Sequence, residues 1–146
     1  MAAWEEREKE ELLLDNGCLY KAHKDTAGNW VIGVGHRLES DPHKEWTQEQ
    51  ISVEFLADFE NAETATAEVV PFFSALDGPR KGALVNLAFS IGGAGLSALH
   101  GMLAAMDSGD WDTAALYLMG SRYARRAGDR VKRLAYRIRT GEYSLR

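Results

Sequence analysis

The sequence predicts an α+β fold, mainly helical, with a small antiparallel β-hairpin lobe near the N-terminus, a larger helical lobe and a cleft between them. Three observations lead to this expectation. The chain has 146 residues, 45% of them apolar, which is enough for one sizeable core. Helical periodicity, with caps and glycine separators, runs through most of it. Only residues 20–36 alternate as strands do.

These observations divide the chain into parts of a single domain. We expect one domain over residues 1–146, with the hairpin lobe at about 17–45 and a long connecting helix at about 47–70. The helical lobe should occupy about 71–146 and be completed by the first helix of the chain.

The first helix is predicted over residues 5–16, which are dense in good helix formers. Leu12 and Leu13 fall on one side of it. Gly17 follows directly, and glycine is the residue that most readily closes a helix end.

The hairpin is predicted from alternation on either side of a turn at residues 25–28. Gly33 and Gly35 interrupt the second run, which suggests that another backbone or a ligand approaches closely there. The residues expected on one face are Tyr20, Ala22, Trp30, Ile32 and Val34.

The remaining segments read as helices. Thr47 begins a capping box, and a long helix should run from it to about Val70. An apolar core helix is expected from about Pro79 to Ile91, ending at Gly92 and Gly93. The last three helices are predicted at 96–106, 110–119 and 129–139, with Asp110 and Asp129 as N-caps of the last two.

The charge is unevenly distributed along the chain. The net charge is −5, yet residues 120–146 hold nine Lys or Arg against two acids, and the rest holds eight against twenty. This basic segment could face an anionic partner or the protein's own acidic surface. Nucleic-acid binding is one alternative, but no groove-reading motif is present and the pI is 5.4, so we expect no nucleic-acid partner.

Other classes of protein are disfavoured by what the sequence lacks. Residues 1–10 have neither the basic start nor the apolar run of a secretory signal, so synthesis in the host cytoplasm is expected. No apolar run approaches the roughly 20 residues that span a bilayer, so no membrane insertion is expected. A single cysteine excludes an internal disulfide. His23, His43 and His100 show no metal-ligand spacing, so neither metal nor cofactor is expected.

Two motifs resemble those of the bacteriophage lysozyme family. In residues 15–36 a helix end is followed by Gly, then by an Asp and a Gly-containing turn, then by Val-Ile-Gly-Val-Gly-His. Family members have Glu-Gly at the helix end and Thr-Ile-Gly-x-Gly-His in the strand. Residues 111–143 match the family's Trp helix, Ser-Arg-aromatic turn, spaced arginines and closing Arg-Thr-Gly-x-aromatic. The resemblance covers almost the whole chain and implies a lysozyme-like fold.

The resemblance also implies a reaction and its residues. Family members cleave the β-1,4 bond between N-acetylmuramic acid and N-acetylglucosamine in peptidoglycan. A glutamic acid protonates the leaving oxygen, and an Asp and a Thr hold the attacking water. These positions are Asn16, Asp25 and Val31 here, so only the Asp is retained.

The two departures remove chemical groups that the reaction uses. The Asn16 amide has no acidic proton, and a general acid typically contributes about 10²- to 10⁴-fold in rate. The Val31 side chain has no hydroxyl for a water. Asp15 is a possible substitute acid; alternatively, it is a solvated residue at the helix end. A deliberate change at Asn16 would leave glycan affinity intact, whereas long drift would also erode the cleft.

Further site residues come from the same resemblance. Gly35 and Ser90 should lie where substrate binds, Ser90 replacing a longer polar residue. Arg122 matches an arginine of the cleft wall, where it would contact sugar or peptide carboxylate; an ion pair within the helical lobe is the alternative. His36 is expected to hold the hairpin lobe by a polar contact rather than to act in catalysis.

Two functions remain open besides nucleic-acid binding. The chain is either a muramidase with impaired activity, working through Asp25 and an improvised acid, or an inactive glycan-binding or virion structural protein of the same fold. In both cases the expected partner is the glycan strand of bacterial peptidoglycan, and a monomer is expected. An endolysin without a signal would reach the wall after a separate protein permeabilises the membrane.

Overall fold

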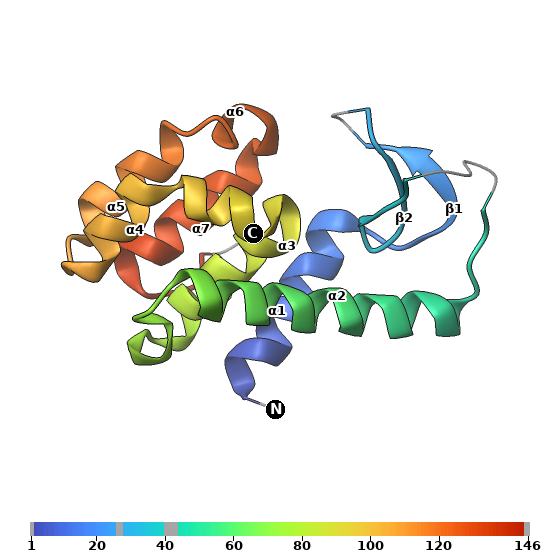
Figure 1. Cartoon of the computed structure of the whole chain (residues 1–146), viewed down its shortest axis with the longest axis horizontal. Helices are drawn as coiled ribbons and strands as arrows, with labels where there is room; N and C mark the ends of the chain where they lie inside the picture. The colour runs from blue at the N-terminus through green and yellow to red at the C-terminus, as the bar shows by residue number, and fades with distance from the viewer. Residues whose placement is uncertain (1, 26–27, 40–43, 145–146) are drawn as a thin grey trace.

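The computed structural model describes residues 2–25, 28–39 and 44–144 and confirms the mainly helical α+β architecture. Figure 1 shows the small sheet on one side, the shorter helices gathered on the other, and α2 running beneath both. The helices are α1 (Ala3–Asn16), α2 (Gln48–Val69), α3 (Gly78–Ala98), α4 (His100–Asp107), α5 (Trp111–Met119), α6 (Ala124–Ala127) and α7 (Asp129–Thr140), with a short 3-10 turn η1 (Phe73–Ala75). The strands are β1 (Leu19–Lys24), β2 (Trp30–Gly33) and β3 (His36–Arg37).

The sheet is antiparallel in the order β1-β2-β3, so it has one strand more than the predicted hairpin. β3 is only two residues long, too short to show alternation, and it pairs with Val31 and Ile32 of β2. The turn expected at 25–28 includes residues 26–27, which lie outside the described residues.

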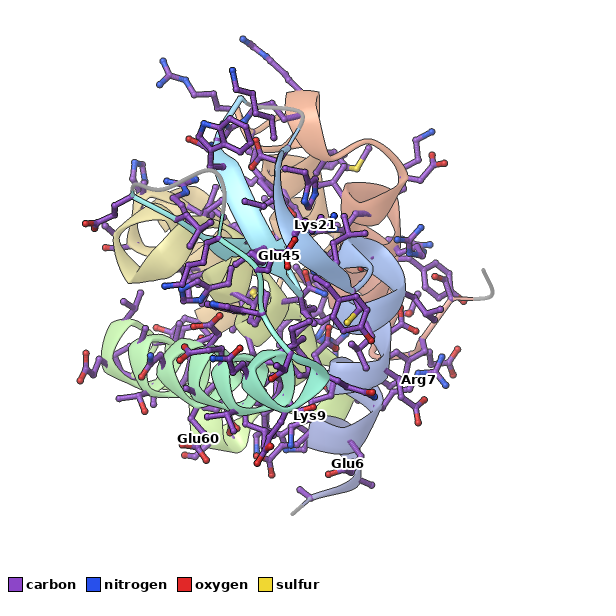
Figure 2. All side chains as sticks on the ribbon, turned by 90° about the vertical axis from the view of Figure 1, so that its right-hand side faces the viewer. Glu6, Arg7, Lys9, Lys21, Glu45 and Glu60 are labelled. Atoms are coloured by element: carbon purple, nitrogen blue, oxygen red, sulfur yellow. The ribbon has the colours of Figure 1, made fainter. Side chains whose placement is uncertain are left out.

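The segment leading into α2 also pairs with the sheet. Lys21 and Glu45 form an isolated antiparallel bridge, and the Trp46 N–H donates to the Tyr20 carbonyl at 2.8 Å. The Lys21 and Glu45 side chains lie together in Figure 2, 3.5 Å apart and largely exposed. Such an exposed ion pair contributes little to the stability of the fold, so the backbone contacts hold this segment in place.

The residues expected on one face of the hairpin are not equally buried. Trp30 is 36% exposed, whereas its neighbours Val31 and Ile32 are both buried. Strict alternation requires that one face of a strand meets water. β2 is the central strand, and neither Val31 on one face nor Ile32 on the other is left in water.

The helix boundaries follow local signals where such signals exist. The Gly17 N–H donates to the Leu13 carbonyl at 2.9 Å, and Gly17 adopts a φ of 70°, so it ends α1 as predicted. The capping box also forms: the Gln50 N–H donates to Thr47 Oγ1 at 3.2 Å, and the Thr47 N–H donates to Gln50 Oε1 at 2.9 Å. Asp110 caps α5 by accepting from the Thr113 N–H at 3.2 Å.

Three boundaries differ from expectation. α3 kinks at Gly92 but continues to Ala98. The single helix predicted over 96–106 is broken at Leu99, and α4 leaves at 84° to α3. Asp129 is the first residue of α7 rather than its cap, because Gly128 with a φ of 57° turns the chain just before it. The short α6 was not predicted.

No single helix in the described part of the chain is long and apolar enough to cross a membrane. Among these helices, only α3 and α4 taken together, across the 84° bend between them, have the length and apolar composition of a membrane span.

The core lies where α3 packs against α1, α2 and α7, with α5 packed between α4 and α7. It also encloses a polar cluster. Asn86 Nδ2 donates to Glu8 at 2.7 Å, and Arg137 donates to the other oxygen of the same carboxylate. Gly82 is needed beside them, because a Cβ there would lie 2.5 Å from Glu8 Oε2. The largest buried apolar side chains include Leu12, Phe59, Leu84, Leu87, Leu96, Met102, Met106, Leu118, Leu134 and Ile138.

Candidate active site

A cleft of about 1000 Å³ lies between the sheet and the helical lobe. The sheet and the end of α1 form one side, α2 and the kinked part of α3 form its floor, and α6 and α7 close the other side. The site residues predicted from sequence that line it are Asp15, Asn16, Asp25, Val31, Gly35, His36 and Ser90. The sequence resemblance therefore identified residues that the fold brings to one cavity.

Asn16 is the last residue of α1 and lies against the turn after β2. Its Nδ2 donates to the Leu12 carbonyl at 2.9 Å, one helical turn earlier. A Cβ on Gly35 would lie 3.0 Å from Asn16 Oδ1, and Gly35 has a φ of 68°. The close approach expected at Gly35 is thus an approach to Asn16, and it fixes the amide at the edge of the cleft.

Arg130 of α7 connects three residues of the cleft. Its guanidinium donates to Asn16 Oδ1 at 3.3 Å and to Ser90 Oγ at 3.1 Å. Its Nε lies 3.6 Å from Asp15 Oδ2. In the sequence Arg130 is simply one of the spaced arginines of the motif at residues 111–143, because nothing local shows that it reaches residues far away in the chain.

Asp15 is not the solvated residue that one interpretation predicted. Its side chain is only 4% exposed, and besides Arg130 it accepts a hydrogen bond from Arg133. The helix end is covered by α7, which supplies both guanidiniums. The two guanidiniums therefore hold the Asp15 carboxylate against α7.

Asp25 directly follows β1 and lies at the turn of the hairpin. The Asn29 N–H donates to Asp25 Oδ1 at 2.9 Å, and the Asp25 N–H donates to the Asn29 carbonyl at 2.9 Å. The turn therefore orients the carboxylate through its own backbone. This is the one retained polar position of the three implied by the resemblance.

Val31 is 6% exposed and presents methyl groups to the cleft. Its cross-strand partner is His23, whose side chain also lines the cleft. His23 Nδ1 is buried and has no hydrogen-bond partner among the residues that the structure describes. Sequence reasoning considered His23 only as a metal ligand and missed this unsatisfied nitrogen, because its neighbour across the sheet was unknown.

His36 makes the kind of contact expected of it. Its Nδ1 lies 2.7 Å from Asp58 Oδ2 of α2, and its ring centroid lies 5.1 Å from that of Trp46. The contact joins the sheet to α2 at the rim of the cleft. Glu54 lies close to the same pair, so these three side chains could hold a metal ion.

Arg122 does not lie where the resemblance suggested. It is exposed in the turn between α5 and α6 and is absent from the cleft lining. The arginines that do line the cleft are Arg37, Arg126 and Arg130. The short α6 follows Arg122 and brings the later arginines to the cleft.

Comparison with known proteins agrees with this geometry. The chain matches the phage lysozyme family over residues 15–140, a range that includes the end of α1, the sheet and α7. It is also 28% identical to the pre-baseplate central spike protein Gp5 of Enterobacteria phage T4, over 157 aligned residues. That alignment covers 90% of this chain but only 27% of the relative's length. With its two-lobed fold, its cleft and this match, the chain belongs to the phage lysozyme family.

Proposed function

We propose that this lysozyme-like protein binds peptidoglycan glycan strands in its cleft and hydrolyses the bond between N-acetylmuramic acid and N-acetylglucosamine poorly or not at all. The proposal rests on the side chains at the C-terminal end of α1. Asn16 occupies the position of the general acid, and the adjacent Asp15 is held by Arg130 and Arg133. An amide cannot donate an acidic proton, and removing such a donor typically costs about 10²- to 10⁴-fold in rate.

Binding is supported by the size and chemistry of the cleft. A space of about 1000 Å³ is at the upper end of the range found for ligand pockets. Its lining combines carboxylates and amides with guanidiniums, groups that suit sugar hydroxyls and the carboxylates of the wall peptides. The buried His23 Nδ1 offers a further site for a hydroxyl or a water.

Binding is tested by sedimenting the protein with purified insoluble peptidoglycan. We expect depletion of the parent protein from the supernatant with little release of soluble fragments. Asn61→Trp should weaken this binding, because Asn61 is exposed on α2 and lines the cleft. Thr64→Trp is the matched control, since Thr64 is exposed on the same helix but outside the lining. The proposal would be contradicted if both variants lost binding equally, or if the parent did not bind peptidoglycan.

A second candidate is a role as a wall-directed part of a virion. It is favoured by the similarity to a protein named as a central spike component, of which this chain spans 27%. Mass spectrometry of purified virions tests it. The chain should be present at a fixed number of copies per particle, and its recovery only from the lysate of infected cells would rule this role out.

A further inference from the structure

We propose that His36, Glu54 and Asp58 form a binding site for a divalent transition-metal ion of the Zn²⁺ class at the junction of the sheet and α2. One ligand atom from each residue, an imidazole nitrogen and two carboxylate oxygens, lies within 4.8 Å of the others. Imidazole and carboxylate are ordinary ligands of zinc, at about 2.0–2.2 Å. Three such ligands around one tetrahedral ion lie about 3.4 Å apart, so small side-chain rotations would complete the site.

The geometry uses both elements of the junction. Glu54 and Asp58 are four residues apart on α2, which places them on the same face of the helix. His36 comes from β3, and its Nδ1 already lies 2.7 Å from Asp58 Oδ2. A metal ion bound by both side chains would replace this direct contact. It would then fasten the sheet to α2 more firmly than one hydrogen bond does.

Glu54 distinguishes this cluster from a simple structural contact. It is partly buried, yet it makes no hydrogen bond or ion pair with the residues that the structure describes. A His–Asp pair needs no second carboxylate to hold the two elements together. Two carboxylates and an imidazole nitrogen together supply a cation with three ligands.

The surroundings favour a cation that solvent can reach. α2 carries six carboxylates and neither Lys nor Arg along its length, so the electrostatic potential around it is negative and attracts cations. The His36 and Asp58 side chains are 29% and 23% exposed, which leaves an entry path and room for water at the remaining position. Both residues also line the cleft, so the ion would lie at its rim.

The experiment is calorimetric titration of the EDTA-treated full chain with ZnCl₂. We expect one saturable site, accompanied by a rise in the thermal unfolding midpoint. Glu54→Gln should weaken binding by at least about tenfold, since even loss of an outer partner of a ligand costs about 10- to 100-fold. Glu60→Gln removes the same charge from the same helix and should leave binding unchanged. Figure 2 shows Glu60 on the side of α2 away from the sheet.

A second readout places the ion within the structure. The ring of Trp46 lies 5.1 Å from that of His36, so Cu²⁺ bound at the site should quench its fluorescence, and Trp46→Phe should remove the quenching. Absence of zinc binding by the parent, or equal binding by the parent and Glu54→Gln, would overturn the proposal. Neither result depends on whether the cleft binds glycan strands.

Discussion

α1 makes similar contacts with α7 at two points along its length, and the two contacts have different consequences. Near its middle, Glu8 meets Arg137 and Asn86 in a cluster fully enclosed by the core. At its C-terminal end, Asp15 meets Arg133 and Arg130 beside the cleft. Both contacts join an acid of α1 to guanidiniums of α7, but only the second shares its arginine with cleft residues. The first is therefore part of the stability of the fold, and the second also determines what residue 16 can do.

A third carboxylate of α1 has no guanidinium opposite it. Glu5 is hydrogen-bonded to Glu63 of α2, so two acids share a proton there. Burial, together with the hydrogen bond and negative charge of Glu5, raises the pKa of Glu63 to about 7. α1 thus contacts its neighbours through a buried ion pair, a partly exposed ion pair and a pair of acids. Substitutions in the three pairs should change the stability of the protein by different amounts.

The largest effect is expected from breaking the enclosed cluster. Arg137→Ala should lower the free energy of unfolding by about 3–5 kcal/mol, because it leaves the Glu8 charge buried without its partner. Burial already raises the pKa of Glu8 above its ordinary value, against the opposing effects of Arg137 and Asn86. Urea denaturation measures the loss. Adding Glu8→Gln should recover part of it, and a double variant no more stable than Arg137→Ala would contradict this explanation.

A smaller loss is expected at the cleft end. Asp15→Asn should cost about 1.5–3 kcal/mol, the range for hydrogen bonds to charged groups, because Arg130 and Arg133 lose their shared carboxylate. The two arginine side chains are 19% and 21% exposed, so water compensates in part. Asp107→Asn, at an exposed position on α4, is the control and should change stability by less than about 0.5 kcal/mol. Equal effects in the two variants would mean that the Asp15 contacts are unimportant.

The smallest effect is expected at the acid pair, and it depends on pH. The folded pKa of Glu63 lies above its ordinary value of 4.5, so the folded state binds the proton more tightly than the unfolded state does. The stability from this proton is complete below about 4.5 and is lost as the pH rises through about 7. The thermal midpoint of the parent should therefore fall across that window relative to Glu63→Gln. Parallel midpoint curves for the two proteins would refute the shared proton.

Local sequence signals predicted much of the fold and failed where distant residues decide. Gly17 and the Thr47 capping box act within a few residues, so they marked helix ends correctly. The break at Leu99 carries neither proline nor glycine, and β3 is too short for any periodicity, so both were missed. The site shows the same division. Most residues named from the resemblance line one cleft, but Arg122 does not, and the burial of Asp15 depends on arginines more than a hundred residues later.

The missing hydroxyl at Val31 can be examined once an acid is restored. In an Asn16→Glu background, Val31→Thr should raise the rate of muropeptide release further, because a hydroxyl there can hold the attacking water. The rate constant at saturating peptidoglycan measures the effect. No gain would indicate that another group, such as the His23 imidazole, already holds that water.

The role of residue 16 is measured by comparing the parent with Asn16→Glu for release of soluble muropeptides from purified peptidoglycan. We expect the variant to release them at least about 100-fold faster, in line with the contribution of a general acid. Arg130 already lies within reach of residue 16 and would orient the new carboxyl group. A parent that releases muropeptides as fast as the variant would contradict the central claim that Asn16 deprives this cleft of its acid.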